Sequence, residues 1–477
     1  MDTEMTNNTE VKSNAWRGEP ASGALTAKYG RWALGAVATG VAPLAPPVVD
    51  PWDWRHETVG WGLVLPHGDP AMSVDDLVAA KDAPEPLQAL VAARGPAPVL
   101  RWDPTNPDVL LRYYSGFAAP ETIPIGGTPR GVAPGAIPSF LMLWGGLEAL
   151  PWRLQYALNL DPRIFAGRLP LEGDALARYV SALLGPWDAM AAPEHGRAVV
   201  WATDHAPGDM SHTMRLVVAD PVNRVYADDP DITVTYQAGA DATGASLASV
   251  LGSARPSVIV TTSHGNTGPA GAPDRERLGW LVDAGYAPTD PASLLAAWQP
   301  SGAVWYAHAC CGAGSDATST FAGLFTAGSS LDTMLTEVAG LGSTVAPLPV
   351  SLLGAAEPLR AFIGHVEPTF DWTLYDAASQ HALTGDLKAA LYNELMLGRP
   401  VGWAMAAFHG RAGAEAGLLD DVRPMVLAGT VGADAALRPR LRFLDRRALV
   451  VLGDPAVSLP TTAGSVRPQA GSVRPQT

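Results

Sequence analysis

The chain has 477 residues, of which 47% are hydrophobic and 17% charged, so we expect a folded protein with a large core. Its formal net charge of −15 argues against general nucleic-acid binding, which depends on Lys and Arg that neutralise phosphates. The two cysteines are adjacent in sequence, which argues against a disulfide-framed secreted domain.

The two ends of the chain are polar. The amino terminus, MDTEMTNNTEVKSN, lacks the basic and then apolar order of a signal peptide, and the stretch WALGAVATGVAPLAPPVV is broken by Gly and Pro before it reaches a membrane span. We therefore expect a soluble, cytoplasmic protein with neither a membrane nor a nucleic acid as partner. Residues 1–50 predict a flexible arm, and the tandem AGSVRPQ copies within 461–477 predict a disordered tail.

Short apolar runs recur between these ends and predict strands. Most are continuous and not alternating, which is typical of strands buried on both faces of a mostly parallel sheet. In chain order they are SFLMLWGG (139–146), RAVVWATD (197–204), DITVTYQ (231–237), SVIVTTSHG (257–265), GAVWYAHACCG (302–312), LRAFIGHV (359–366) and ALVVLGDP (448–455).

Segments of helical length separate the strands. TGASLASVLGSA begins with Thr243 as a cap, DPASLLAAW has Pro291 in its first turn, and LKAALYNELMLG ends at Gly398. Alternating strands and helices predict an α/β fold, a three-layer αβα sandwich around a mostly parallel sheet. The stretch GPWDAMAAPEHG (185–196) predicts a boundary between a smaller unit, 51–195, and a larger one, 196–460.

Two predicted strands end in residues with reactive side chains. His264 lies at the end of one strand, and Cys310 lies at the end of the next predicted strand along the chain. Because neighbouring parallel strands end at the same edge of a sheet, we expect the two side chains within hydrogen-bonding reach. A cysteine nucleophile needs such an imidazole, which favours the thiolate and later protonates the leaving amine. Gly265 would let its amide approach a substrate without a Cβ in the way.

A strand ending in His-Gly, a helix, and a strand ending in Ala-Cys resemble the caspase–gingipain clan of cysteine peptidases. The caspase signature is Gln-Ala-Cys, a variable residue and Gly, with a histidine about 50 residues upstream. This chain has HACCG at 308–312, with His308 in place of Gln, and His264 precedes Cys310 by 46 residues. LRAFIGHVEPTFDW, VLGDPAVSL and SFLMLWGGLEALPWRLQYAL resemble gingipain-like and CHAT-domain proteins, so the similarity spans roughly 100–460.

The resemblance implies a caspase-like sandwich and a set of roles. Cys310 would be the nucleophile and His264 the general base and acid of a cysteine endopeptidase. The backbone amides of Gly265 and Cys310 would form the oxyanion hole, and Cys311 would face away or line the pocket. Residues 51–195 would be a caspase-like accessory subdomain and 196–460 the catalytic domain.

The resemblance also bears on substrates and partners. The loop ATDHAPGDMSH would help to build the primary specificity pocket, in which Asp204 and Asp209 would bind a basic residue before the scissile bond. The substrate would be a specific protein, cleaved under regulation by processing, calcium or an activating partner protein. A bacterial stress or defence response is the setting that the family suggests.

Other readings stay open at this point. A small cysteine in an apolar strand is often a core residue, which is the reading kept for Cys311. A zinc site formed by His264, His308, Cys310 and Cys311 is disfavoured, because adjacent cysteines on a strand point to opposite faces. No P-loop or dinucleotide motif is present, so we expect neither a metal nor a cofactor. The rival function is a catalytically silent scaffold or sensor of the same clan.

Overall fold

The structure is a computed structural model that describes residues 49–69, 71–185, 187, 194–269, 271–376 and 379–460. The chain divides into two compact units, 1–50 and 51–477, and the second holds the helices and strands described here. The predicted tail at 461–477 lies outside the described residues, as does all of the predicted arm except residues 49 and 50.

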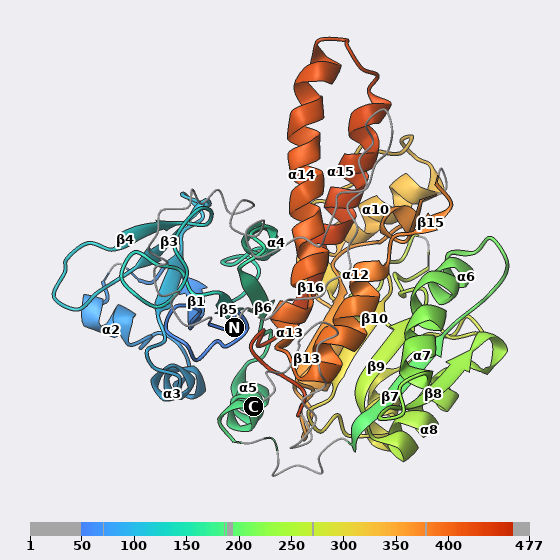
Figure 1. The fold of residues 1–477 in the computed structure, drawn as a ribbon, viewed down its shortest axis with the longest axis horizontal. Coiled ribbons are helices and arrows are strands. Elements are labelled where there is room, and N and C mark those ends of the chain that lie inside the picture. The colour runs from blue at the N-terminus through green and yellow to red at the C-terminus, as the bar shows by residue number, and fades with distance from the viewer. Residues whose placement is uncertain are drawn as a thin grey trace, which may run out of the picture. The chain divides into compact units, whose positions relative to one another are not determined.

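A sheet of twelve strands runs through the second unit (Figure 1). Its order is β4-β3-β2-β1-β5-β6-β16-β13-β10-β9-β7-β8. Most neighbours are parallel; the antiparallel pairs are β2–β3, β3–β4 and β13–β16. The strands are β1 (Trp61–Pro66), β2 (Val99–Trp102), β3 (Val109–Arg112), β4 (Glu121–Pro124), β5 (Phe140–Leu143), β6 (Phe165–Arg168), β7 (Glu194–Ala202), β8 (Thr233–Ala238), β9 (Pro256–Thr262), β10 (Val304–His308), β13 (Ala361–His365) and β16 (Leu449–Gly453). The expected α/β class with a mostly parallel sheet is confirmed.

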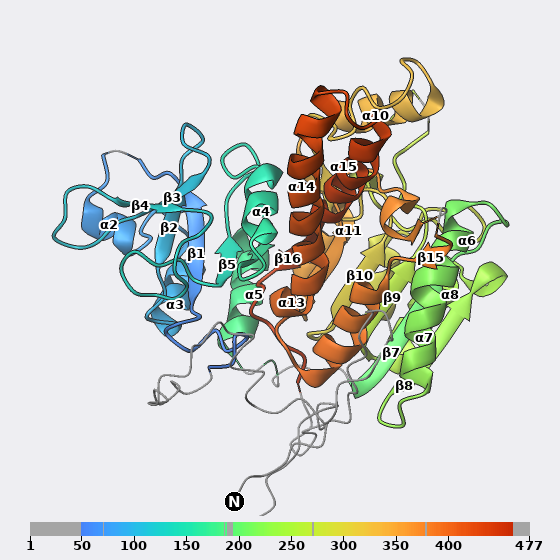
Figure 2. The ribbon, with the colours of Figure 1, turned by 45° about the horizontal axis from the view of Figure 1, so that its top comes forward.

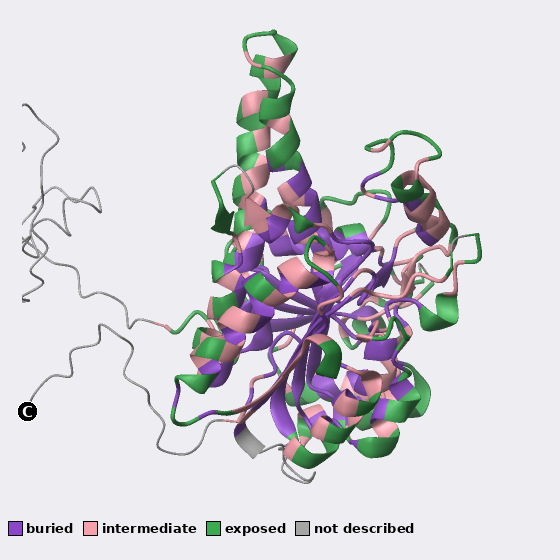
Figure 3. Ribbon diagram, turned by 90° about the vertical axis from the view of Figure 1, so that its right-hand side faces the viewer, coloured by how far each residue is buried: buried purple, intermediate pink, exposed green. Residues whose placement is uncertain are grey.

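All seven strands predicted from apolar runs are present in this sheet, as β5, β7, β8, β9, β10, β13 and β16. Every residue of β9, β10, β13 and β16 is buried, because these central strands are covered on both faces. Figure 3 shows the buried strands surrounded by helices whose outer faces are exposed. The continuous apolar runs are therefore the signature of this position in the sheet.

Helices pack in two series along the sheet. In the first, neighbours meet in the order α3, α5, α11, α9, α8. In the second, α4 packs on α14 and α15, while α12 and α13 also contact α14. Two such series are what a three-layer αβα arrangement requires. The first series is α3 (Glu85–Ala93), α5 (Gly173–Leu184), α8 (Gly244–Ala254), α9 (Pro291–Ala297) and α11 (Pro347–Leu353); the remaining α-helices are α2 (Val74–Val78), α4 (Trp152–Leu160), α6 (Met210–Met214), α7 (Asp220–Ala227), α10 (Ser330–Gly340), α12 (Gly385–Lys388), α13 (Val401–Ala404), α14 (Ala406–Leu427) and α15 (Asp434–Arg447).

Helix ends follow the predicted capping chemistry. Thr243 caps α8 in a capping box with Ser246, and α9 begins at Pro291 after the aspartate cap Asp290. The segment that ends at Gly398 is α12 followed by a π-helical turn (Ala389–Glu394) and a 3-10 turn (Leu395–Leu397). Gly398 adopts a φ of 72°, the left-handed conformation that ends a helix.

The hairpin of α14 and α15 is not among the sequence predictions. Figures 1 and 2 show the two helices side by side, projecting from the sheet. Their outer turns are largely exposed, so a buried stripe is absent from the sequence there. None of the helices among the described residues combines the length and apolar character that crossing a membrane requires.

Strands on both sides of the predicted domain boundary belong to the same sheet. β6 pairs in parallel with β16, and this pair joins β1–β6 to the strands that follow residue 194. The boundary itself falls in the connection between α5 and β7. Two small two-stranded sheets complete the unit: β11 (Gly314–Ser315) with β12 (Thr344–Val345), and β14 (Tyr375–Asp376) with β15 (His381–Ala382).

Candidate active site

His264 and Cys310 follow neighbouring strands at the same offset. β9 and β10 pair in parallel, with Thr262 opposite His308. His264 lies two residues beyond Thr262, and Cys310 lies two residues beyond His308. Both therefore emerge at the carboxyl edge of the sheet, where open α/β sheets place their active sites.

The backbone at Gly265 lies directly against Cys310. A Cβ built at position 265 would overlap the carbonyl oxygen of Cys310 and come within 2.9 Å of its amide nitrogen. Only glycine allows the two chain segments to approach so closely. The sequence expectation that a glycine is needed here thus has a steric basis, although the group it meets is the Cys310 backbone.

The amides expected to form the oxyanion hole are unpaired. Gly265 faces Leu281 in an antiparallel bridge whose hydrogen bonds are made by the flanking residues, Val282 N–H to His264 O and Asn266 N–H to Trp280 O. In such a pair the central N–H points away from the partner strand. Within the described part of the chain, neither the Gly265 nor the Cys310 amide donates to an acceptor on another residue. Two neighbouring free N–H groups can bind an anionic oxygen.

The Cys310 thiol is partly buried and protonated at rest. Its S–H donates to the carbonyl oxygen of Thr369, with a Sγ–O distance of 3.6 Å. The side chain packs against a buried cluster that includes Leu278 and Val338. Burial in these apolar surroundings raises the pKa of Cys310 to about 11.

His264 forms its side-chain hydrogen bond with an aspartate instead of the cysteine. Its Nε2 donates to Oδ1 of Asp209 over 2.9 Å, and one third of the His264 side chain is exposed. Both His264 and Cys310 lie within the described residues, and no hydrogen bond joins their side chains. The tautomer with hydrogen on Nε2 leaves Nδ1 as the basic atom of the ring.

Asp209 is fixed in place by the helix that it caps. It is the N-cap of α6, and its Oδ1 accepts from the Ser211 amide over 2.8 Å and from the Ser211 hydroxyl over 2.5 Å. Burial opposes its ionisation, yet the Ser211 and His264 hydrogen bonds outweigh burial and hold the pKa of Asp209 below its ordinary value. A charged carboxylate therefore faces the imidazole.

Asp204 belongs to a separate ion cluster. Its carboxylate accepts from Arg215 Nε over 2.8 Å and lies 3.0 Å from His212 Nδ1. Arg215 also pairs with Asp220 over 3.2 Å. The two aspartates expected to bind a basic substrate side chain thus both have partners within the protein, and their substrate role stays a prediction.

Cys311 is a core residue. It is fully buried beside Leu278 and Val338, and its pKa is raised well above the ordinary value by burial. Its φ of 55° lies in the left-handed region, and its amide donates to the Glu367 carbonyl over 2.8 Å. This strained conformation turns the second cysteine away from the strand direction and into the packed interior.

His308 belongs to a buried aromatic group. Its Nδ1 bonds to the Tyr306 hydroxyl over 2.7 Å, and its ring lies 4.8 Å from that of His365. Burial lowers the pKa of His308 and of His365 to about 3, so both rings are neutral. The disfavoured zinc set of His264, His308, Cys310 and Cys311 does not converge: within the described ranges the one group whose ligand atoms meet is His205, Asp209 and His264.

The sequence reasoning missed His205 and the contact of Asp209 with His264. His205 stacks on His264 with ring centroids 5.4 Å apart. A signal was available, because both missed residues follow the predicted strand 197–204, and that strand, β7, pairs directly with β9. Which strands are neighbours cannot be read from a single sequence, so the convergence was hidden.

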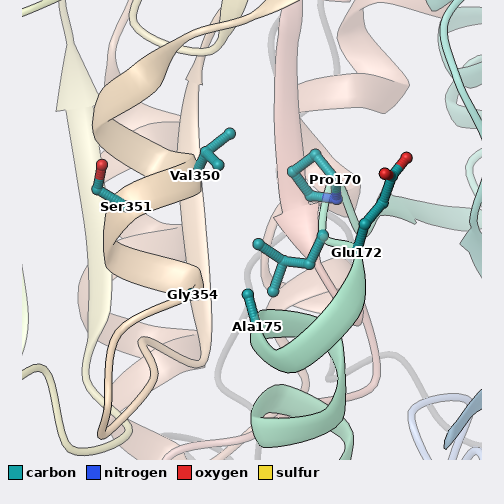
Figure 4. Close-up of a pocket in the computed structure, with 7 residues that line it drawn as sticks. Pro170, Glu172, Ala175, Val350, Ser351 and Gly354 are labelled. Atoms are coloured by element: carbon teal, nitrogen blue, oxygen red, sulfur yellow. The ribbon is translucent and has the colours of Figure 1, made fainter.

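Two pockets lie where segments before residue 195 meet segments after it. One is lined by the start of α5 and by α11, with Pro170, Glu172 and Val350 among its lining residues (Figure 4). A larger one, of about 610 Å³, lies at the ends of β5 and β6 and includes Arg168 and Arg275. Neither pocket is lined by His264 or Cys310. Compared with known protein families and with characterised proteins, the chain has no match.

Proposed function

We propose that the protein is a cysteine endopeptidase on a caspase-type α/β sandwich, with Cys310 as nucleophile and His264 as base. The observation that carries the proposal is the convergence at one sheet edge of Cys310, an aspartate-bound imidazole and the two free amides of Gly265 and Cys310. Each is a part that acyl transfer to a thiol requires.

The proposed reaction uses these groups in sequence. The Nδ1 atom of His264 takes the thiol proton, and the Cys310 sulfur attacks the peptide carbonyl carbon. The oxyanion accepts hydrogen bonds from the Gly265 and Cys310 amides. The C–N bond then breaks, the amine leaves with the proton from His264, and a thioester remains. Water, deprotonated by the same imidazole, hydrolyses the thioester and restores the thiol.

The resting thiol must change partner before it can react. Its hydrogen bond to Thr369 and its raised pKa hold it protonated in the free protein. The proposed reaction requires the thiol to exchange the Thr369 carbonyl for the His264 ring. Contacts between a nucleophile and its base are often longer in the free enzyme than in the substrate complex. Substrate binding would therefore activate the cysteine, in keeping with a regulated peptidase that cleaves a specific protein.

The same two facts favour a second candidate function. A thiol that is protonated and bonded away from the histidine is also what a catalytically silent scaffold or sensor would keep. Such a protein would retain the sandwich and its packing without turning over a substrate. The two functions differ in whether Cys310 forms a covalent bond with a carbonyl-directed probe.

Covalent capture tests the proposal. The protein is incubated with a library of peptidyl acyloxymethyl ketones, in which sulfur displaces the carboxylate leaving group, and the adduct is mapped by mass spectrometry. The peptidase predicts one adduct, on Cys310, that Cys310→Ala abolishes and Cys311→Ala retains. Equal, slow labelling of native protein and His264→Ala would contradict activation by the imidazole and support the silent scaffold.

A further inference from the structure

Three side chains with metal-binding atoms meet at a cluster that includes the proposed base, His264. One ligand atom each from His205, Asp209 and His264 lies within 4.8 Å of the others. The His264 Nε2–Asp209 Oδ1 distance is 2.9 Å and the His205 Nδ1–Asp209 Oδ1 distance is 3.9 Å. They come from the segments that follow β7 and β9, two strands that are neighbours in the sheet. The term imidazole–carboxylate cluster denotes these three residues below.

His205 is oriented as a metal ligand is. Its side chain is 0% exposed, and its Nε2 donates to the carbonyl oxygen of Asp283 over 2.9 Å. Donation from Nε2 fixes the tautomer and leaves a lone pair on Nδ1, the atom that faces Asp209. Metal-binding histidines commonly anchor their second nitrogen to a carbonyl or carboxylate in this way. The Tyr286 ring, stacked on His205 with centroids 3.9 Å apart, holds the plane of the imidazole.

The Nδ1 atom of His205 shares the Ser211 hydroxyl with Asp209. Its near neighbour is the Ser211 hydroxyl, 3.2 Å away. That hydroxyl has a single proton, which it gives to Asp209 Oδ1 over 2.5 Å, and it accepts from the His205 amide. The buried Nδ1 atom of His205 thus faces Asp209 across a hydroxyl that contacts both, 3.9 Å from the Asp209 Oδ1 atom.

The donor set suits a borderline transition metal. Two imidazole nitrogens and one carboxylate oxygen are the ligands of many zinc sites that keep an open position, whereas Ca²⁺ and Mg²⁺ prefer all-oxygen sites. Tetrahedral zinc with bonds of about 2.0–2.1 Å places its ligands about 3.3 Å apart. The two distances to Asp209, 2.9 and 3.9 Å, lie on either side of this value, and all three ligand atoms lie within 4.8 Å of one another. Side-chain shifts of about 1–2 Å would therefore complete the site.

We infer that the imidazole–carboxylate cluster binds one Zn²⁺ and that this binding inhibits the enzyme. The inhibition rests on the proposed peptidase function, whereas the metal site does not. Zinc on Nε2 of His264 would replace the hydrogen bond to Asp209 and withdraw electron density from the ring. The Nδ1 atom would then be a weaker base for the Cys310 proton. Zinc binding would leave the fold intact and would reversibly prevent His264 from accepting the Cys310 proton.

Direct binding tests the site without reference to activity. Full-length protein freed of metal with a chelator is titrated with ZnCl₂ against a chromophoric competitor, and with CoCl₂ while the visible absorption is recorded. We expect one equivalent of each ion, with a Co²⁺ spectrum of low coordination number and no thiolate charge-transfer band. Absence of any bound equivalent, or a thiolate band that implicates Cys310, would overturn the site.

Variants assign the ligands. His205→Ala should weaken zinc binding by at least about 10–100-fold. The matched control is His212→Ala, since His212 lies in the adjoining helix α6 but bonds to Asp204 outside the cluster. Circular dichroism verifies that both variants fold. If His205→Ala does not fold, the Co²⁺ spectrum of the native protein still tests whether the site binds metal. Equal affinity in native protein and folded His205→Ala would contradict the assignment.

Activity separates the inhibition from the proposed function. With a cleavable peptide, zinc should abolish cleavage at the concentration that fills the site, and a chelator should restore it. Binding without any effect on cleavage would overturn the inhibition alone. Binding by a protein that cleaves nothing, with or without chelator, would support the metal site and contradict the peptidase.

Discussion

The Nε2 atom of His264 donates a hydrogen bond to Oδ1 of Asp209, which is itself fixed at the start of α6 by Ser211. The carboxylate thus sets the tautomer of the imidazole and the direction in which its basic Nδ1 atom can act. In this arrangement Asp209 positions the imidazole that we propose as the base, although the loop that carries Asp209 was expected to contact substrate.

Asp209→Asn should lower kcat about 10–100-fold with a smaller effect on KM, because the amide no longer stabilises a charged imidazole. Asn caps helices as well as Asp, so α6 should remain formed. Asp290→Asn is the matched control, as Asp290 caps α9 through the same type of bond, to the Ala292 amide over 2.8 Å. Peptide cleavage kinetics measure both, and an unchanged kcat in Asp209→Asn would contradict the positioning role.

Gly265→Ala should reduce activity by at least about 100-fold, because the new methyl group overlaps the Cys310 carbonyl and displaces the nucleophile and both amides. It should also cost about 1–3 kcal/mol of unfolding free energy through overpacking. Gly417→Ala, at an exposed position of α14 with open space around it, should be neutral or stabilising. Initial rates and denaturant melts measure these effects. Full activity in Gly265→Ala would show that activity does not require the close approach of the residue 265 backbone to Cys310.

Buried neutral histidines should make the protein sensitive to acid. Burial lowers the pKa of His308 and His365 to about 3 and that of His409 to about 4. Below their ordinary pKa of about 6.5, the unfolded chain binds protons that the folded chain refuses, so the free energy of unfolding falls as the pH falls. Glu367, with a pKa raised to about 7, and Asp445, with a raised pKa, contribute with the opposite sign.

A variant isolates one histidine from these opposing groups. His365→Phe should lower the slope of unfolding free energy against pH, between about pH 6 and pH 4, by up to about 1.4 kcal/mol per pH unit. His381→Phe, at an exposed position, is the control and should leave the slope much less affected. Urea melts at a series of pH values provide the slopes. Identical slopes for native protein and His365→Phe would show that His365 is not held neutral.

The resting cysteines should react slowly and differ from each other. Because the pKa of Cys310 is raised to about 11, its alkylation by iodoacetamide should accelerate about tenfold per pH unit up to about pH 10. Cys311 is fully buried and should react only when the chain unfolds. Peptide mapping after timed alkylation distinguishes the two thiols. A rate that levels off near pH 8 would indicate a preformed thiolate and contradict the protonated resting state.

Much of the fold was predictable because burial leaves a direct trace in the sequence. Seven continuous apolar runs correspond to strands, and the starts of α8 and α9 follow from the Thr243 cap and from Pro291 in the first turn. Strands β1 to β4 and β6 and the hairpin of α14 and α15 were not predicted, although β1 is itself a buried apolar run, WGLVLP. β3 and β4 are only partly buried, and the outer turns of the hairpin are exposed, so neither shows a strong apolar pattern.

The site was predictable where the chain order and the spatial order of the strands agree. β9 and β10 are consecutive in the main sheet, so His264 and Cys310 were correctly placed at one edge. The contribution of β7 was missed because β8 lies between β7 and β9 in the chain but at the edge of the sheet. The direction of each side chain also escaped prediction: the left-handed φ of Cys311 and the turn of the Cys310 thiol toward Thr369 depend on tertiary contacts.

The most direct test of the proposed peptidase function is a peptide-library digest read by mass spectrometry, with native protein, Cys310→Ala and Cys311→Ala compared side by side. We expect cuts by the native protein that share a preferred residue, persist in Cys311→Ala and vanish in Cys310→Ala. Two results would contradict this function. One is cuts that persist in Cys310→Ala, and the other is a native protein that neither cuts any peptide nor forms the covalent adduct on Cys310.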